Sequence, residues 1–234
     1  MYERGRPDYP AAAIARIVEC LGLRPGRTVL DLAAGTGKLT RLLVPSGANV
    51  IAVEPVREMR QELEKRVPAV AALAGTAERI PLTDGYVNAV TVGQAFHWFD
   101  ANAALREIRR VLRPGGGIAL IWNARDERHP LQAALSEIIG TLEGDTPHRQ
   151  QRNWKTMLAE SGLFERCERA LFEHVQPLDE QGVVERVLSI SFIAAAPQSV
   201  RDAVAARVRA LAQKAEKPIR LPYMTEVYLG FRAD

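Results

Sequence analysis

A short turn of small residues, with a carboxylate on each side of it in the sequence, is the stretch best suited to bind a ligand. Asp31 ends an apolar run, and residues 33–37 follow as Ala-Ala-Gly-Thr-Gly. Glu54 ends the next apolar run, 19 residues after Gly35. Backbone amides of such a turn hold polar groups, and a carboxylate after the second strand accepts hydrogen bonds from ribose hydroxyls. The pattern predicts a nucleotide-like ligand.

Two well-known glycine motifs do not fit this turn. A phosphate-binding loop needs a glycine where Leu32 stands and a serine or threonine where Leu39 stands. A dinucleotide-binding turn that begins at Gly35 needs its third glycine where Thr40 stands. A phosphate cradle and a nicotinamide or flavin dinucleotide are therefore disfavoured, although a nicotinamide-dependent enzyme is kept as an alternative. A purely structural turn is the other alternative.

The two acids narrow the choice of ligand. Asp31 beside the turn would repel a pyrophosphate, but it suits a ligand that carries an ammonium group. Glu54 suits the two hydroxyls of a ribose. Turn amides together with these acids fit a zwitterionic amino acid joined to adenosine, which is S-adenosylmethionine.

The elements around these residues predict an α/β fold. We expect strands at residues 28–32, 49–53, 70–73, 88–92 and 118–123, separated by helices, with Asp100 capping the helix that precedes the last of them. This alternation predicts right-handed crossovers and a Rossmann-like, doubly wound, mostly parallel sheet. Ligands of such sheets lie at the carboxyl ends of the strands. Residues 31–37, Glu54, residues 75–78 and residues 93–98 are all expected at that edge.

The pattern changes after residue 123. We expect two or three helices between residues 130 and 161, a strand at 170–176, helices at 180–191 and 198–216, and a final strand at 224–231. The two strands would complete a seven-stranded sheet as an antiparallel edge, with the helices as a cover over the ligand. We expect one domain, 1–234, made of a cofactor-binding core at 1–125, a helical cover and edge-strand region at 126–222, and a final strand at 223–234.

Several of these stretches resemble one protein family. Residues 29–37, 52–55, 75–82, 94–99 and 112–116 are similar to the motifs of the class I S-adenosylmethionine-dependent methyltransferases with a type 11 domain. Within this family they resemble the small-molecule branch that includes trans-aconitate methyltransferase. The resemblance implies methyl transfer to an O- or N-nucleophile of a small molecule, with S-adenosylhomocysteine as product. A binding module that keeps the cofactor site without methylating anything is the second hypothesis.

The resemblance also implies positions for the cofactor. Residues 33–37 would run under the methionine part, Glu54 would hold the ribose, and residues 76–78 would surround the adenine. The implied cofactor-binding residues are Asp31, Ala33, Gly35, Thr36, Gly37, Glu54, Pro55, Thr76, Ala77, Glu78, Gln94 and Ala95. Two positions depart from the family. Ala33 replaces the first glycine of the turn, so we expect a negative φ there. Thr76 replaces an acid that often meets the adenine.

His97 is the candidate catalytic base, because its ordinary pKa suits proton removal from an acceptor. The alternative is a histidine that only lines the site. Trp98 would shield the methyl group, and Arg125 would face an acceptor carboxylate. The segment before the first helix would close the site or meet the acceptor through Tyr2, Arg4, Arg6 and Tyr9.

Composition excludes other classes of partner. The net charge of +3 does not indicate nucleic-acid binding, because the densest basic run, at Arg106, Arg109, Arg110 and Arg113, reads as the solvated face of one helix. No histidine or cysteine spacing predicts a metal site. No apolar run predicts a membrane span or a signal peptide. We expect Cys20 and Cys167 to be buried thiols of a cytoplasmic protein, which would act on its small-molecule substrate as a monomer or homodimer.

Overall fold

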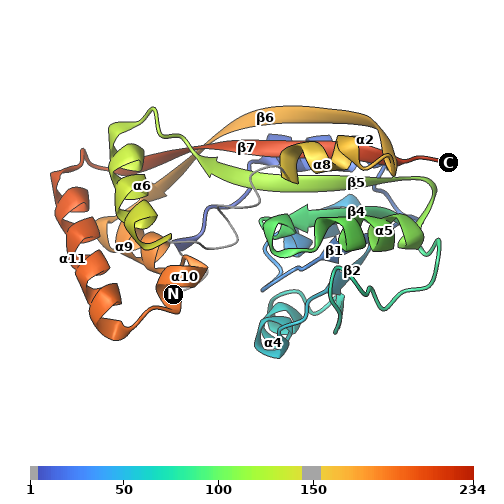
Figure 1. Ribbon diagram of the computed structural model, residues 1–234, viewed down its shortest axis with the longest axis horizontal. Coiled ribbons are helices and arrows are strands. Elements are labelled where there is room, and N and C mark those ends of the chain that lie inside the picture. Colours follow the sequence, from blue (N-terminus) through green and yellow to red (C-terminus); the bar gives the residue numbers. More distant parts are fainter. Residues whose placement is uncertain (1–4, 144–153) are drawn as a thin grey trace. The chain divides into compact units, whose positions relative to one another are not determined.

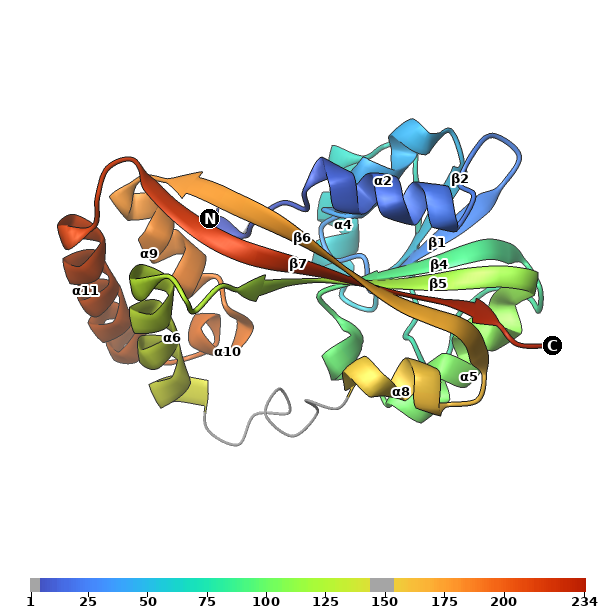
Figure 2. The ribbon, with the colours of Figure 1, turned by 90° about the horizontal axis from the view of Figure 1, so that it is seen from above.

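The computed structural model describes residues 5–143 and 154–234, and Figures 1 and 2 show the arrangement of its elements. The strands are β1 (Thr28–Leu32), β2 (Asn49–Val53), β3 (Ala71–Leu73), β4 (Val87–Gly93), β5 (Leu112–Arg125), β6 (Phe164–Leu178) and β7 (Ile219–Arg232). The helices are α2 (Ala11–Cys20), α3 (Thr40–Leu43), α4 (Arg57–Arg66), α5 (Ala101–Val111), α6 (Pro130–Glu143), α8 (Trp154–Glu160), α9 (Glu180–Leu188), α10 (Ser191–Ala194) and α11 (Gln198–Lys214), with short 3-10 helices η1 (Val44–Ser46) and η2 (Phe96–Trp98).

The strands form one seven-stranded sheet in the order β3-β2-β1-β4-β5-β7-β6. The pairs β3–β2, β2–β1, β1–β4 and β4–β5 are parallel. Strand β7 runs opposite to its neighbours β5 and β6 (Figure 2). The predicted Rossmann-like, doubly wound sheet with an antiparallel C-terminal edge is confirmed. Strand order reverses between β1 and β4, which is where ligands bind in open sheets of this kind.

The chain divides into two compact units. The sheet unit comprises Tyr9–Trp122, Gln151–Phe172 and Glu226–Asp234, and the helical unit comprises Met1–Asp8, Asn123–Gln150 and Glu173–Thr225. The helical unit has its own core, in which α6, α9, α10 and α11 contribute buried residues such as Ile138, Val184, Ile193 and Val208. The division of a single domain into parts that end at residues 125 and 222, which the sequence suggests, stays a prediction.

The sheet unit buries both faces of its parallel strands. Val29 and Val50 pack in one cluster with residues of α2, α3 and α4, while Leu30 and Ile51 pack in another with residues of α5 and α8. Figure 2 shows α2 on one side of the sheet and α5 with α8 on the other. Because both faces are covered, the strands are apolar almost throughout rather than alternating. A polar residue such as Asp31 within them therefore stands out.

Several element ends differ from the expected ones. The helix after the glycine turn begins at Thr40 and passes into η1, whereas the sequence suggested a start at residue 38. Strand β5 begins at Leu112, because Leu112 already pairs with Val87 before the register shifts. Strands β6 and β7 are longer than expected. The helix expected at 180–191 is divided into α9 and α10. The predicted cap is confirmed, since the Asp100 side chain accepts a hydrogen bond from the amide of Ala103 at 3.0 Å.

Two expectations about single residues were wrong. Cys20 is the last residue of α2, and its side chain is only half-buried. Cys167 lies on the edge strand β6, and its side chain is exposed. Ala33 has a φ of +54° instead of a negative value. The amide of Ala34 donates to the carbonyl of Val53 at 3.1 Å. The turn that makes this bond requires the left-handed conformation at residue 33, whichever side chain stands there.

Among the described residues, none of the helices has the length and apolar character that a membrane crossing requires.

The left-handed conformation of Ala33 predicts that a glycine substitution changes the free energy of unfolding in opposite directions at Ala33 and at its neighbour Ala34. A left-handed alanine costs about 1–2 kcal/mol, so Ala33→Gly should raise the free energy of unfolding by about 0.5–1 kcal/mol. Ala34 has no positive φ, so Ala34→Gly should lower it by about the same amount, because glycine is more flexible in the unfolded chain. Urea unfolding of both variants checks this, and a loss of stability in Ala33→Gly would contradict the turn described here.

Candidate functional site

The carboxyl ends of four parallel strands place the predicted ligand-binding residues at one edge of the sheet unit. The registers Leu32↔Val53 and Val53↔Leu73 bring the ends of β1, β2 and β3 level, and Asp31 pairs with Thr91 of β4. The turn at 33–37, Glu54, the segment 75–78 and the segment 93–98 directly follow these ends.

Glu54 links two of these ends. Its carboxylate is only 5% exposed. Oε2 accepts a hydrogen bond from the amide of Gly35 at 2.9 Å, and Oε1 accepts one from the amide of Val56 at 3.0 Å. Each carboxylate oxygen can accept more than one hydrogen bond, so Glu54 keeps acceptor capacity for a ligand hydroxyl. The space over Gly35 is open, since a Cβ atom there would meet nothing within 4 Å.

Asp31 lies beneath the turn and is 1% exposed. The Thr40 hydroxyl donates to its Oδ2 at 2.6 Å, and the Thr91 hydroxyl donates to its Oδ1 at 3.1 Å. Burial raises the pKa of the Asp31 carboxyl to about 7, although the two hydroxyl hydrogen bonds act to lower it. Neither threonine was predicted from the sequence as a partner of Asp31. A polar residue at 91, inside an otherwise apolar strand beside β1, was the available signal.

The segment after β3 is held by the start and the middle of α5. Thr76 is exposed and Ala77 is buried. The Glu78 carboxylate accepts a hydrogen bond from the amide of Asp100, the N-cap of α5, at 3.0 Å. A Cβ atom at Gly75 would lie 2.6 Å from the Pro81 ring, so the close return of the chain here requires glycine. Pro55, on the other side of Glu54, is exposed.

Arg110 of α5 fixes the same segment, which corrects the description of the arginine run as a solvated face. Its guanidinium donates to the carbonyls of Ile80 and Leu82 at 3.0 and 2.8 Å and to the Asp84 carboxylate at 2.8 Å. Glu107 pairs with Arg110 at 2.7 Å and accepts the amide of Ile80 at 3.0 Å. These contacts tie the loop between β3 and β4 to one helix. In the sequence, the signal for the Glu107–Arg110 pair was a glutamate three residues before an arginine.

The segment after β4 carries the candidate base. Gln94 has a φ of +57°, and its amide donates to the carbonyl of Ile121 at 3.0 Å. Ala95 is buried. His97 is 5% exposed, and its ring centroid lies 4.9 Å from that of Trp98 and 4.8 Å from that of Trp122. Trp98 is 51% exposed. The buried Tyr9 hydroxyl approaches Gly93 closely, since a Cβ atom there would be 2.8 Å away.

Among the other predicted site residues, Arg6 and Arg125 belong to the helical unit. The Arg6 guanidinium donates to the carbonyl of Ser189 at 3.2 Å, and the Arg125 side chain donates to the Ser136 hydroxyl at 2.9 Å. Gly5 lies against α9, because a Cβ atom there would be 2.7 Å from the Glu185 carbonyl. Tyr2 and Arg4 lie outside the described residues.

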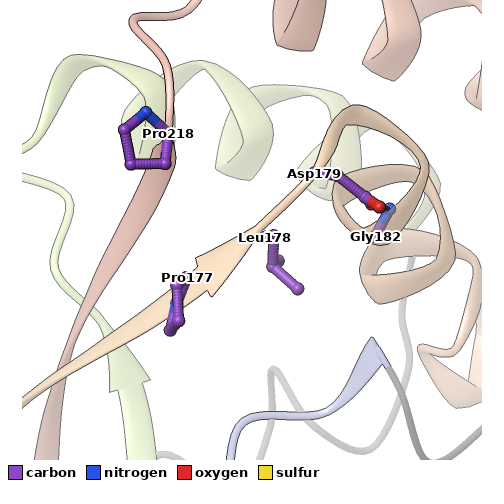
Figure 3. Close-up of a pocket in the computed structure, with 5 residues that line it drawn as sticks. All are labelled: Pro177, Leu178, Asp179, Gly182 and Pro218. Carbon is purple, nitrogen blue, oxygen red and sulfur yellow. Dashed lines mark hydrogen bonds between the residues drawn. The ribbon is translucent and has the colours of Figure 1, made fainter.

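A pocket of about 450 Å³ lies elsewhere, within the helical unit (Figure 3). It is lined by Pro177, Leu178, Asp179, Gly182 and Pro218. The Asp179 carboxylate accepts a hydrogen bond from the Gly182 amide at 2.6 Å, as the cap of α9. No residue proposed from the sequence lines this pocket. Within residues 5–143 and 154–234, no three histidine, cysteine, aspartate or glutamate side chains are grouped as metal ligands.

The raised pKa of Asp31 predicts how stability depends on pH. Between about pH 4 and 7 the folded protein keeps a proton on Asp31 that the unfolded chain has lost, so rising pH favours unfolding. This residue should lower the free energy of unfolding by about 1.4 kcal/mol per pH unit in that interval. Asp31→Asn should remove this contribution. Urea unfolding of both proteins at pH 5 and 7.5 measures it, and an equal pH dependence in the two would contradict the assignment.

Comparisons with known proteins show the family of the chain. Residues 30–120 match the family model described as a methyltransferase domain. The chain is 43% identical over 229 residues to an uncharacterized methyltransferase of Mycobacterium tuberculosis, covering 96% of this chain and 89% of that protein.

Solved structures of methyltransferases share the fold. A proposed type II methyltransferase from Anaeromyxobacter dehalogenans has a TM-score of 0.73 at 21% identity, and 97% of each chain is covered. Phosphoethanolamine N-methyltransferase 2 of Haemonchus contortus, solved with phosphomonomethylethanolamine and S-adenosylhomocysteine, has a TM-score of 0.56 at 16% identity, covering 95% of this chain and 53% of that one. The specific resemblance to the trans-aconitate branch stays a prediction. The chain belongs to the class I S-adenosylmethionine-dependent methyltransferases.

Proposed function

We propose that this methyltransferase holds S-adenosylmethionine at the carboxyl edge of β1–β4 and methylates an oxygen or nitrogen atom of a small molecule, leaving S-adenosylhomocysteine. The observation that carries the proposal is the Glu54 carboxylate, buried at the end of β2 and 2.9 Å from the amide of Gly35. It stands next to an open glycine and still has acceptor capacity. An acceptor for ribose hydroxyls needs these properties.

The other residues of the edge fit the remaining parts of the cofactor. Asp31, Ala33, Gly35, Thr36 and Gly37 would hold the methionine part. Pro55 would border the ribose, and Thr76, Ala77 and Glu78 would surround the adenine. The exposed Thr76 offers a hydroxyl, whereas the Glu78 carboxylate already accepts the Asp100 amide and would act through its second oxygen or through the loop it fixes. Gln94 and Ala95 would lie beside the sulfonium.

The cofactor supplies an activated methyl group on sulfur, so the protein mainly has to align the acceptor and exclude water. We assign proton removal to His97. Its ring is buried and contacts the rings of Trp98 and Trp122, which give the site an apolar wall. A dedicated base is required only if the acceptor loses its proton before transfer. Contact of Arg125 with an acceptor carboxylate stays a prediction from the sequence. So does the role of Arg6 and Tyr9 in closing the site or meeting the acceptor. The family assignment leaves the nicotinamide alternative without support.

Binding of S-adenosylhomocysteine tests the cofactor assignment. Glu54→Ala removes the acceptor for two hydroxyls, and each hydrogen bond to a charged group contributes about 1.5–3 kcal/mol, so the dissociation constant should rise by about 100-fold or more. Glu58→Ala, an exposed carboxylate in the first turn of α4, is the matched control and should bind like the native protein. Calorimetry with circular dichroism as a check of folding measures both. Unchanged affinity in a folded Glu54→Ala protein would show that the ribose lies elsewhere.

A screen of small O- and N-nucleophiles, read by the release of S-adenosylhomocysteine, identifies the acceptor. The same assay with that acceptor then tests His97 as the base. His97→Ala should lower kcat by about 10²–10⁴-fold and remove the rise of kcat with pH, while the affinity for S-adenosylhomocysteine is kept. His129→Ala, which changes an exposed histidine, is the control. If His97→Ala changes KM and leaves the pH profile intact, His97 is a wall of the site. Cofactor binding without turnover on any acceptor would favour the binding-module hypothesis.

A further inference from the structure

Strand β6 forms the outer edge of the sheet, and no described strand lies beyond it. It is 15 residues long, and most of its side chains are exposed. Leu171 is 50% exposed and Val175 is 37% exposed, which makes them two of the large apolar side chains most open to water in the described chain. Long, exposed, partly apolar edges offer unpaired backbone groups to a further strand, and proteins usually protect them.

The sequence of β6 is complementary to itself when it is reversed about Leu171. In an antiparallel pair with a second copy, Leu171 would stand opposite Leu171, Arg169 opposite Glu173, and Cys167 opposite Val175. All of these residues alternate onto one face of the strand. Opposite charges and apolar pairs in such positions each stabilise a sheet. A shift by one residue pair would place Arg169 opposite Leu171 or Leu171 opposite Glu173 and lose this match.

We propose that two copies of this chain associate through their β6 edges, antiparallel and centred on Leu171, so that their sheets become continuous. The exposed apolar side chains select a protein partner, and the charge pattern selects a second β6 strand in this register. Backbone hydrogen bonds of the two edges would supply the affinity, and the paired side chains would supply the specificity.

One other register also matches charges, and the backbone disfavours it. Centred on Cys167, it would set Glu165 opposite Arg169 and Arg166 opposite Glu168. Arg166 has a φ of +48°, however, which interrupts the extended backbone in the middle of that pairing. The described residues on the C-terminal side of Arg166 have no positive φ within β6. The Leu171-centred pairing therefore uses the regular part of the edge.

The mass in solution tests the association. The native protein should have twice the chain mass of 25.8 kDa by light scattering, and Leu171→Asp should have the single mass, because it sets two carboxylates opposite each other. Val56→Asp changes an apolar residue of similar exposure outside β6 and should stay dimeric. A monomeric native protein, or a dimeric Leu171→Asp variant, would overturn the proposal.

Cross-linking tests the register. Opposed Cα atoms of an antiparallel pair are about 4.5–5.5 Å apart, which a disulfide can bridge. The double variant Cys167→Ser with Leu171→Cys should therefore form a covalent dimer on oxidation. Cys167→Ser alone, which keeps Cys20, and Cys167→Ser with Val56→Cys should not. A covalent dimer of the native protein through Cys167, with none from the Leu171→Cys variant, would show that the register is the other one.

A charge reversal adds a check that does not depend on thiols. Glu173→Arg would face Arg169 of the second copy and should give the single mass. Combining it with Arg169→Glu restores opposite charges and should restore the dimer. The Arg169 side chain also pairs with the buried Glu226 at 2.8 Å, so the combined variant is first shown to be folded by circular dichroism. A folded combined variant that stays monomeric would contradict the Arg169–Glu173 pairing.

Discussion

The hydrogen bond between the Gly35 amide and the Glu54 carboxylate holds the candidate site together. It joins the turn after β1 to the end of β2, and the second oxygen of the same carboxylate holds the amide of Val56 at the start of α4. Leaving a buried carboxylate without partners is costly, so these amides also keep Glu54 in place before any ligand arrives. The carboxylate that is proposed to meet the ribose is thus already oriented by the backbone.

Beneath this bond, the site depends on the core of the sheet unit. Asp31 is surrounded by apolar strands and is held by hydroxyls from the next helix and from β4. Helix α5 packs Leu105 and Ile108 into the core on one side, while Glu107 and Arg110 hold the loop after β3 on the other. The packing of the core and the geometry of the candidate site therefore depend on the same elements. A change in the position of α5 would move the segment that is proposed to meet the adenine.

The sequence predicted well those features that arise from local spacing. Apolar runs ending in Asp31 and Glu54 placed two strands and the edge where both acids lie. The alternation of strands with helices predicted the parallel, doubly wound sheet. It predicted poorly what depends on contacts between distant residues. The sign of φ at Ala33 follows from the bond between Ala34 and Val53, which side-chain size alone does not reveal. Separate elements must come together before Thr40 and Thr91 can bind Asp31, or Arg110 can bind the loop after β3. The exposure of Cys167 likewise depends on how the elements pack.

The pKa of Asp31, near 7, has a consequence for how ligand binding is measured. A cation placed beside this carboxyl favours its charged form, and a carboxyl that is half-protonated at neutral pH must then release its proton to the solvent. Binding of an ammonium-bearing ligand would carry the ionisation heat of whatever buffer takes up that proton. Calorimetric enthalpies in phosphate and in Tris would then differ, and the difference would count the protons exchanged at this single buried group.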